Sequence, residues 1–494
     1  MASRTRRGLL ALGALLLLPA WGAPPPNLLF ILLDDFGWND AGYHNGGRPN
    51  EGWTSTPTLD RLAASGVKLE SYYTAPICSP SRAQIMTGRY QIRVGIQHGC
   101  YGASQGTGLP LDEVTIADAL SRLDYETWMF GKWHLGFDEA AFLPTSRGFD
   151  YHYGHYDACV NAWNHTVGKT GTEKPRVVDE PGTHTCELLA RDAVAKLAAR
   201  DDARPLFVYL AFHMVHESDG AADGARSVAS PDKPTKLLEA PEAYTAKFKD
   251  AGLNATRQTF LGMVALVDDA VGNVTDAWAA AGLGGVVVVA SDNGSPHDAR
   301  GFAGNLPLRG QKHELWEGGV RVPAFVFGAG VPRGAARRNV VAAVDWWPTL
   351  VKLAGGASSA DASLDGVDLW PAVARGDDVR SELLHNFDTS SKPTAGFRGA
   401  LRVGDLKLVL LEKHKQTLLY NVTADPREAA DLAARRPGDA AALLAKLEAY
   451  GAAAVPCWGG TGPTPNPANF SGDCDAHPAR SCETPAVYAP GWCG

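Results

Sequence analysis

The sequence has no excess of positive charge and, beyond its first residues, no long hydrophobic run. Its 46 lysines and arginines face 54 acidic residues, and the formal net charge of −8 argues against a general nucleic-acid-binding protein. No later segment is long and apolar enough to span a membrane, and no internal repeat or low-complexity tract is evident. A hydrophobic content of 45% over 494 residues predicts one large domain with a smaller one beside it.

The N-terminus, MASRTRRGLLALGALLLLPAWGA, is typical of a secretory signal peptide. Three arginines precede an apolar run from Leu9 to Leu18, and small residues follow up to Gly22, after which we expect cleavage. A membrane anchor is the alternative, but the run is short for a bilayer. We therefore predict that residues 1–22 direct the protein into the secretory pathway, to be secreted or kept in a lysosome-like acidic compartment.

Glycosylation and disulfide signals agree with this route. Five Asn-x-Ser/Thr sequons are candidate acceptors: Asn164, Asn254, Asn273, Asn421 and Asn469. The eight cysteines are Cys78, Cys100, Cys159, Cys186, Cys457, Cys474, Cys482 and Cys493. Four of them lie near the C-terminus, so we predict a disulfide-stapled tail over 451–494. Cys159 and Cys186 flank the Asn164 sequon, and we favour a disulfide between them.

Four apolar runs each end in polar residues. These residues are Asp34 and Asp35 after run 28–33, Lys132 and His134 after the run through 129–130, His213 and His216 after run 206–212, and Asp292 and Asn293 after run 286–290. Unbroken apolar runs of this length indicate buried parallel strands. Helical patterns over 115–123, 188–197 and 259–278 alternate with them, which predicts a doubly wound parallel sheet. In such sheets ligands bind beyond the carboxyl ends of the strands, where all four polar groups fall.

The strand-end residues predict a metal site next to an anion site. Asp34, Asp35, Asp292 and Asn293 offer hard oxygen donors, which suit Ca²⁺ or Mg²⁺ better than Zn²⁺. A solvated Asp-Asp turn is common, but it would leave the second pair unexplained. The groups expected around the metal are Arg82, Lys132, His134, His216 and Lys312. Such a pocket suits a multiply charged oxyanion, and spacing alone does not choose between sulfate and phosphate esters.

The stretch APICSPSRAQIMTGRYQ, residues 75–91, adds a cysteine to this site. Pro80 suits the first turn of a helix and Gly88 its end, so we expect Cys78 at the positive N-terminus of a helix, with Arg82 one turn further on. A disulfide half is the ordinary alternative for a cysteine in a secreted chain, and a catalytic thiolate is the next. The thiolate alternative does not account for the Asp/Asn metal set.

Taken together, these motifs resemble the signature of the sulfatase family. Cys78-Ser-Pro-Ser-Arg82 followed by Thr87-Gly88-Arg89 is similar to the family's C-x-P-S-R and Thr-Gly-Arg elements. The likeness continues, in the family's order, through LLDDFGWND, GKWHLG, SDNG, PLRGQKHELWEGGVRVP, VDWWPTLVKLAG and LYNVTADPREAADLA, from about residue 27 to about residue 434. LRGQK and LWEGGVR look most like the arylsulfatase B (N-acetylgalactosamine-4-sulfatase) type.

The resemblance implies a fold and a division of the chain. We expect an α/β catalytic domain of the alkaline-phosphatase type over 27–390, with a central, mostly parallel sheet flanked by helices. A smaller α+β domain over 391–450 would follow, with antiparallel strands in FRGALRVGDLKLVLLEKHKQTLLYNV and one or two helices in the Ala-rich stretch after it. The arylsulfatase B type also suggests that Cys100 pairs with the C-terminal cysteines.

A mechanism is implied as well. In sulfatases the signature cysteine, here Cys78, is converted to Cα-formylglycine by the formylglycine-generating enzyme, and its hydrated aldehyde attacks sulfur through a covalent sulfate-ester intermediate. The implied ligands of one Ca²⁺ are Asp34, Asp35, modified Cys78, Asp292 and Asn293. By the same resemblance, Arg82 steadies the formylglycine, His134 takes the hemiacetal proton, Lys132 and Lys312 bind sulfate oxygens, and His216 and Lys312 assist the leaving oxygen.

Two departures and two rival functions accompany this interpretation. We expect His213 to be a packed strand residue, because the family motif has histidine just before glutamate, as His216 does. A serine found near the pocket in some sulfatases is missing from GFDYHYGHYDACVNAW.

One rival function is that of a phosphatase or phosphodiesterase of the same superfamily, which commonly has Ser or Thr and two metals. The other is an inactive glycan-binding homologue, against which the full set of motif residues argues. By family analogy we prefer a sulfated carbohydrate as substrate.

Overall fold

The structure is a computed structural model, and it describes most of the chain between residues 24 and 457. The described residues are 24–45, 54–101, 107–137, 139–158, 160, 162–163, 167–170, 176–178, 182–217, 238–296, 304–357, 363–412 and 415–457. The signal peptide, Cys159, the sequons at Asn164 and Asn469, and the tail from residue 458 lie outside them. Among the described helices, none combines the length and apolar character needed to cross a membrane.

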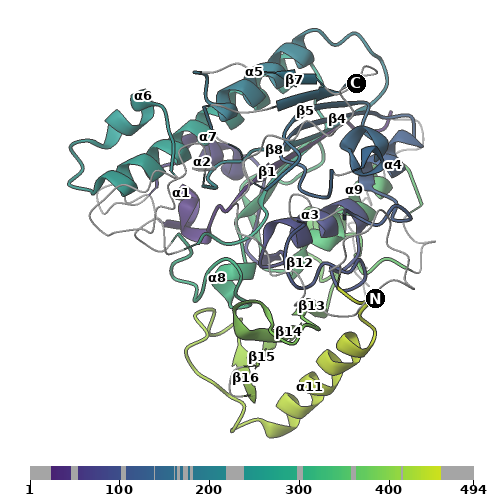
Figure 1. The fold of residues 1–494 in the computed structure, drawn as a ribbon, viewed down its shortest axis with the longest axis vertical. Helices are drawn as coiled ribbons and strands as arrows, with labels where there is room; N and C mark the ends of the chain where they lie inside the picture. Colours follow the sequence, from purple (N-terminus) through teal and green to yellow (C-terminus); the bar gives the residue numbers. More distant parts are fainter. Residues whose placement is uncertain are drawn as a thin grey trace, which may run out of the picture.

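A ten-stranded sheet runs through the larger domain (Figure 1). In spatial order its strands are β11 (Ala335–Arg337), β2 (Val67–Leu69), β10 (Ala324–Gly328), β9 (Val286–Ser291), β1 (Leu28–Leu33), β8 (Leu206–Ala211), β4 (Glu126–Gly131), β5 (Tyr151–Gly154), β6 (Val167–Thr170) and β7 (Arg176–Val178). The four predicted strands are β9, β1, β8 and β4, which are consecutive neighbours and all parallel. The doubly wound sheet is therefore confirmed.

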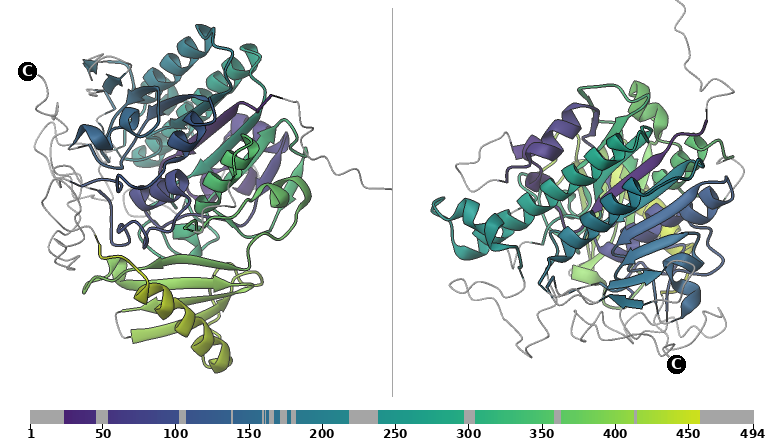
Figure 2. Two further views of the ribbon diagram at one scale, coloured as in Figure 1. Left: turned by 90° about the vertical axis from the view of Figure 1, so that its right-hand side faces the viewer. Right: turned by 90° about the horizontal axis from the view of Figure 1, so that it is seen from above.

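Helices cover both faces of this sheet (Figure 2), which explains the unbroken apolar runs. Along β1, Leu28, Phe30 and Leu32 belong to one core, whereas Leu29, Ile31 and Leu33 belong to the other. The first core is covered by α3 (Cys78–Thr87), α4 (Ile116–Ser121), α9 (Trp346–Leu353) and α10 (Trp370–Arg375). The second core is covered by α2 (Pro57–Ala64), α5 (Thr185–Ala198) and α7 (Ala255–Ala280).

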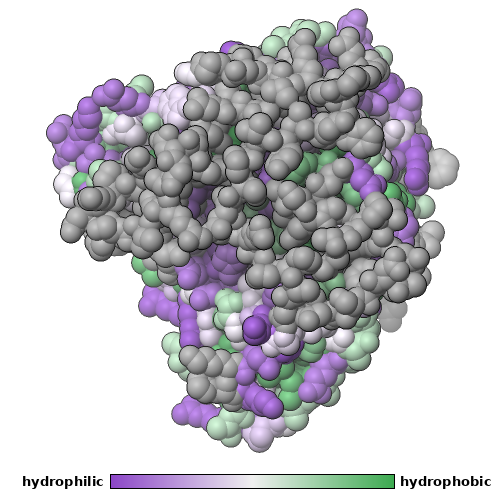
Figure 3. Space-filling view, in the orientation of Figure 1, coloured by the Kyte–Doolittle hydropathy of each residue, from purple (hydrophilic) through white to green (hydrophobic). Residues whose placement is uncertain are grey.

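Short elements complete the larger domain. They are α1 (Gly42–Asn45), α6 (Glu242–Thr245), α8 (Glu317–Val320), and β3 (Tyr72–Tyr73) paired with β12 (Val341–Ala342). The α6 corner presents mainly hydrophilic residues to solvent (Figure 3).

Helix α3 begins and ends where its sequence predicts. Cys78 is its first residue, Pro80 lies in the first turn, and Gly88 caps the C-terminus with a left-handed φ of 68°. The Gly88 N–H closes the helix on the Gln84 carbonyl at 2.9 Å. The whole helix is buried, so Cys78 and Arg82 reach the interior of the domain.

The smaller domain is a four-stranded antiparallel sheet with one helix (Figure 2, left). Its elements are β13 (Glu382–Phe387), β14 (Phe397–Val403), β15 (Leu406–Leu411), β16 (Gln416–Asn421) and α11 (Pro437–Ala452). The antiparallel strands expected in FRGALRVGDLKLVLLEKHKQTLLYNV are β14 to β16, and β13 joins them from the chain before residue 391. The Ala-rich stretch forms a single helix that buries Leu443 and Leu447 against this sheet.

Two expected disulfides are wrong in this structure, because Cys186 and Cys100 are both free thiols. Cys186 lies in the first turn of α5 and is buried in the apolar core beneath it, where a thiol behaves as a small hydrophobic group. Cys100 is held near Cys78 instead of the tail, because the Tyr101 N–H donates to Ser79 Oγ at 3.3 Å. Cys457 is disulfide-bonded, and its partner is none of the other cysteines that the structure describes.

Candidate active site

The polar ends of β1, β9, β8 and β4 meet at one edge of the sheet, as the sequence predicted. Asp34, Asp292, Lys132 and His213 follow these strands directly or closely, and all four are at most 2% exposed. Asp35 turns inward at a left-handed φ of 59°, and its N–H donates to Asp292 Oδ1 at 3.1 Å. The four strand ends therefore form one buried site.

Each carboxylate of this site is paired with a cation. Lys132 Nζ lies 2.6 Å from Asp34 Oδ2, and Lys312 Nζ lies 2.8 Å from Asp35 Oδ1. Arg82, from α3, lies 2.8 Å from Asp292 Oδ2 and also donates to the Lys132 carbonyl at 2.9 Å. Three acids thus face three cations in the described cluster.

The pairing decides which acids keep their charge. Burial raises the pKa of Asp34, but Lys132 and the other cations outweigh burial and hold this pKa well below its usual range. The pKa of Asp35 is lowered in the same way, against burial, chiefly by Lys312. Burial, the neighbouring Asp34 and Cys78 raise the pKa of Asp292 well above its usual range, although Arg82 opposes them. Asp34 and Asp35 are therefore the firmly ionised pair.

Cys78 lies against this pair, at the N-terminus of α3. Its Sγ is 3.5 Å from Asp34 Oδ1. A hydrogen bond from Cys100, opposed by burial and helped by Lys132 and Lys312, holds the pKa of the Cys78 thiol well below its usual range. The surroundings that favour a thiolate here favour any anion formed on this side chain.

The donor atoms of this site fit a hard divalent cation. Ligand atoms of Asp34, Asp35, Cys78 and His216 all lie within 4.8 Å of one another. Asn293 donates to Asp35 Oδ1 at 2.6 Å, and its own Oδ1 is buried with no hydrogen-bond partner among the described residues. An orphaned amide oxygen beside two ionised carboxylates is the donor set that Ca²⁺ or Mg²⁺ prefers.

Hydrogen bonds to backbone carbonyls fix the tautomers of two histidines. His134 Nε2 lies 3.0 Å from the Tyr101 carbonyl, and His216 Nδ1 lies 2.8 Å from the Glu217 carbonyl. Because a carbonyl only accepts, both of these nitrogens carry protons, and Nδ1 of His134 is left with its lone pair. Burial lowers the pKa of His134, which keeps it neutral and able to accept a proton.

The structure adds one group that the sequence did not single out and gives a second group a different neighbour from the expected one. His155 directly follows β5, a fifth strand of the same parallel set, and its ring centroid lies 5.2 Å from that of His213. Because β5 reads Tyr-His-Tyr-Gly, it has no apolar run to mark it as a buried strand. The sequence predicts a disulfide between Cys100 and the tail, yet Cys100 forms a hydrogen bond with Cys78. His155 is not predicted because its strand lacks an apolar run, and the neighbour of Cys100 is not predicted because a disulfide was expected there.

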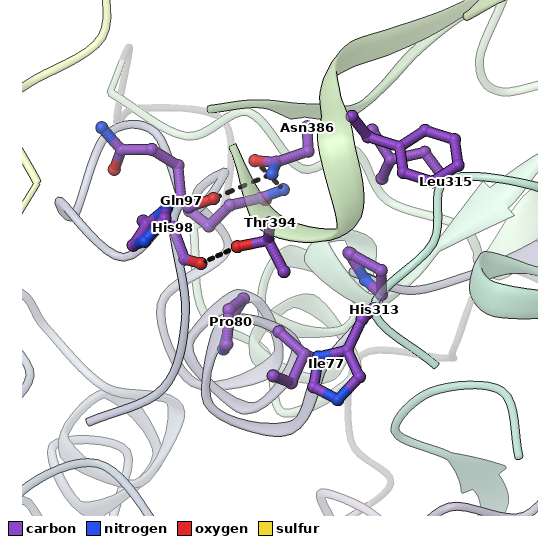
Figure 4. A pocket seen from close by; sticks show the side chains of 11 residues that line it. Ile77, Pro80, Gln97, His98, His313, Leu315, Asn386 and Thr394 are labelled. Atoms are coloured by element: carbon purple, nitrogen blue, oxygen red, sulfur yellow. Dashed lines mark hydrogen bonds between the residues drawn. The ribbon is translucent and has the colours of Figure 1, made fainter. Parts of the chain in front are cut away.

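A pocket beside the site lies between the two domains (Figure 4). Ile77 and Pro80 from the start of α3, with His313 next to Lys312, form one wall. Asn386 and Thr394 from the smaller domain form the other. Asn386 Nδ2 donates to the Gln97 carbonyl at 2.8 Å, and Thr394 Oγ1 donates to the His98 carbonyl. These bonds tie the smaller domain to the segment that leads to Cys100.

Comparison with known proteins identifies the family. The Sulfatase family model matches residues 26–357, which include all the assembled strand ends and α3. The chain belongs to the sulfatase family. It is 34% identical to mouse arylsulfatase J over 489 residues, covering 88% of this chain and 77% of that protein. It is 31% identical to human arylsulfatase A over 460 residues, covering 82% of this chain and 83% of that protein.

Solved structures agree with this assignment. Ps i-CgsB, crystallised in complex with k-i-k-neocarrahexaose, superposes with a TM-score of 0.74 and 27% identity, covering 86% of this chain and 92% of that one. The predicted sulfatase, with its alkaline-phosphatase-like sheet and smaller antiparallel domain, is confirmed, and this sulfatase is a sulfuric ester hydrolase. The arylsulfatase B subtype stays a prediction.

Proposed function

We propose that this sulfatase hydrolyses sulfate esters of carbohydrates through a formylglycine formed from Cys78. The observation that carries the proposal is the position of Cys78, at the N-terminus of α3 and 3.5 Å from an Asp34 that is paired with Lys132. The carbohydrate class is supported by Ps i-CgsB, which was solved with k-i-k-neocarrahexaose. The maturing enzyme would be the formylglycine-generating enzyme of the secretory pathway, to which residues 1–22 direct the chain.

The modified side chain supplies a nucleophile that a thiol cannot replace. One hydroxyl of the hydrated aldehyde attacks sulfur as the S–O bond to the alcohol breaks, and the second hydroxyl then loses a proton and expels sulfate as the C=O bond re-forms. His134 Nδ1 is the acceptor for this proton, because its Nε2 is engaged by the Tyr101 carbonyl. Arg82 steadies the nucleophile from within α3, where it is fully buried.

Lys132 and Lys312 would bind the sulfate oxygens. Both ammonium groups are buried, and both hold raised pKa values: burial opposes the charge, but Asp34 and Asp35 respectively outweigh it. They therefore remain charged through the reaction and meet the negative charge that develops on the sulfate. His216 and Lys312 would together assist the leaving oxygen, with the Lys312 ammonium as the proton donor and His216 Nε2 beside it, 3.8 Å from Asp35 Oδ2.

A single Ca²⁺ would be held by Asp34, Asp35, residue 78, Asp292 and Asn293. When bound, the metal would supply positive charge to the site. A dication bound among these acids would add positive charge to the pocket, which suits the sulfate dianion released at the end of the reaction.

A substrate comparison tests the proposal against its rivals. Purified mature protein is assayed on 4-nitrophenyl sulfate, 4-nitrophenyl phosphate and a panel of sulfated oligosaccharides, with desulfated oligosaccharides as the control. We expect sulfate release from the aryl sulfate and from at least one oligosaccharide, and little phosphate release. Preferential phosphate release would support a phosphatase, and binding of sulfated glycans without turnover would support an inactive glycan-binding homologue.

A further inference from the structure

His213, for which the sequence indicated only a packing role, shares its hydrogen-bond acceptor with His216. The Glu217 carbonyl lies 3.0 Å from His213 Nε2 and 2.8 Å from His216 Nδ1. Both nitrogens carry protons, because a carbonyl can only accept. In the neutral rings, His213 Nδ1 and His216 Nε2 are therefore the acceptor nitrogens.

These two acceptor nitrogens face matching acid–lysine pairs. His213 Nδ1 lies 3.5 Å from Asp34 Oδ2, the oxygen that holds Lys132 at 2.6 Å. His216 Nε2 lies 3.8 Å from Asp35 Oδ2, which holds Lys312 at 3.0 Å. A lone pair and a carboxylate oxygen cannot bond to each other, so the proton donors available at each place are the two ammonium groups.

His213 is fixed in place but not satisfied. It is 2% exposed, and its ring packs edge-on against His155 at 5.2 Å and 89°, which restricts its rotation. Its Nδ1 has no hydrogen-bond partner among the described residues. A buried acceptor left unpaired destabilises the fold, so a structural role alone does not explain why this nitrogen faces the site.

The Lys132 ammonium has the protons to complete the arrangement. It carries three donors, and the structure shows one of them used by Asp34. A bound sulfate oxygen would take a second, and the third is left for His213 Nδ1, which approaches the same Asp34 oxygen as Lys132 Nζ.

We propose that His213 is a positioning residue of the sulfatase reaction. Its Nδ1 accepts a hydrogen bond from Lys132 while that ammonium binds sulfate, and its Nε2 shares the Glu217 carbonyl and so fixes the orientation of His216. The inference rests on the proposed role of Lys132 in sulfate binding, which the experiment below tests separately.

The experiment compares His213→Gln with His213→Met, two unbranched side chains of nearly equal length. Glutamine offers both a donor for Glu217 and an acceptor for Lys132, whereas methionine offers neither in comparable strength. In mature enzyme, we expect His213→Met to raise the inhibition constant of inorganic sulfate and to lower kcat/KM for an aryl sulfate, each about 10- to 100-fold. His213→Gln should restore most of both. His213→Phe replaces the methionine variant if that protein does not fold.

The outcomes separate the two proposals. Equal impairment in His213→Gln and His213→Met would show a purely structural role, and wild-type behaviour in both would show no role, so either result overturns the inference. Lys132→Met is measured in parallel. If it leaves the sulfate inhibition constant unchanged, the proposed sulfate site is wrong. If it raises that constant while His213→Met does not, only the role of His213 is wrong.

Discussion

Among the described residues, two clusters of buried charges contrast with each other, because one has the features of an active site and the other does not. The first is the strand-end cluster around Asp34, Asp35 and Cys78. The second, which we call the interface cluster, joins the larger domain to the smaller sheet and consists of Tyr73, Glu317, Arg402, Lys407 and Glu428. Lys407 Nζ lies 2.9 Å from Glu317 Oε1 and 3.0 Å from Glu428 Oε1, and all three side chains are fully buried.

The clusters differ in the polar groups that lie beside their acids. In the interface cluster, Glu317 Oε2 accepts from Tyr73 at 2.8 Å, and Glu428 Oε2 accepts from the Glu317 N–H at 2.7 Å. Glu317 Oε1 accepts from Lys407, whereas Glu428 Oε1 has an ion pair with Lys407 at 3.0 Å but no hydrogen bond among the described residues. In the strand-end cluster, Asn293 Oδ1 and His213 Nδ1 have no hydrogen-bond partner among the described residues. Buried charge alone therefore does not mark catalysis. What marks the strand-end cluster as catalytic is the presence of unpaired acceptors beside a nucleophile.

The largest expected effect is the loss of activity on replacing the nucleophile of the strand-end cluster. Cys78→Ser should lower kcat/KM for an aryl sulfate by a factor on the order of 10⁴ or more, because serine has one hydroxyl and cannot expel the bound sulfate. Its melting temperature should stay close to that of the wild type. Mass spectrometry of the variant should show a trapped sulfate ester, and normal turnover would disprove the mechanism.

Asn293→Ala should weaken metal binding, because it removes the orphaned oxygen donor. At a metal concentration of 100 times the wild-type dissociation constant, bound metal stabilises the fold by about 2.7 kcal/mol, and we expect the variant to lose most of this gain. Thermal melts with and without chelator and added Ca²⁺ measure it. Asn339→Ala, which alters a distant asparagine, is the matched control. A metal-dependent shift of normal size in Asn293→Ala would contradict the assignment.

Replacing a charge of the interface cluster should lower the stability of the fold and leave catalysis unchanged. Lys407→Met leaves Glu317 and Glu428 buried together without their cation, and breaking a buried pair in this way costs about 3–5 kcal/mol. Chemical denaturation measures the loss, and kcat corrected for the folded fraction should be unchanged. Lys352→Met, in an exposed pair with Asp368, should change stability by less than about 1 kcal/mol. A large fall in kcat for folded Lys407→Met would show that the interface cluster also contributes to catalysis, which would contradict the distinction between the two clusters.

The pH dependence of stability sharpens the same contrast. Burial, with the neighbouring Glu317 and against Lys407, raises the pKa of Glu428 to about 7. A raised pKa means that the protonated acid favours the fold, so this contribution is complete below the usual glutamate value of about 4.3 and is lost as the pH rises through about 7. Wild type should thus lose up to about 3 kcal/mol relative to Glu428→Gln between pH 4.5 and pH 8. Parallel stability curves for the two proteins would show that Glu428 does not titrate there.

The smallest effect concerns Cys186, which is buried under α5 as a free thiol. Cys186→Ala should cost about 1 kcal/mol, as expected for losing a small apolar group, whereas loss of a disulfide would cost about 2–5 kcal/mol. Peptide mapping without reduction checks the same point directly. A Cys159–Cys186 peptide in the native protein would restore the pairing that the structure rejects.

The strand-end cluster could be predicted from the sequence because each of its strands has a local signal in the sequence. β1 is an unbroken apolar run that stops at two aspartates, and β9 stops at Asp292 and Asn293 in the same way. Parallel strands bring such ends together without further information. The interface cluster has no such signal, because Glu317, Lys407 and Glu428 come from separate elements whose meeting depends on how two domains pack.

His213 and Cys100 show a different limit of the sequence. His213 was placed correctly at the end of β8, but its role depends on hydrogen-bond directions that only coordinates give. Cys100 was assigned to a disulfide because cysteines in secreted chains usually pair, whereas the backbone bond from Tyr101 to Ser79 holds it beside Cys78. Local sequence patterns thus identify residues such as His213 and Cys100, but only the three-dimensional contacts identify the groups that they interact with.

The chemical state of Cys78 in active protein tests the central claim most directly. The enzyme is purified from a secretory host, its aryl-sulfate turnover is measured, and the peptide containing Cys78 is analysed by mass spectrometry before and after aldehyde-specific labelling. We predict that the peptide carries an aldehyde in place of the thiol, and that turnover rises in proportion to the converted fraction across preparations. Full turnover in protein whose Cys78 is an unmodified, alkylatable thiol would contradict the account.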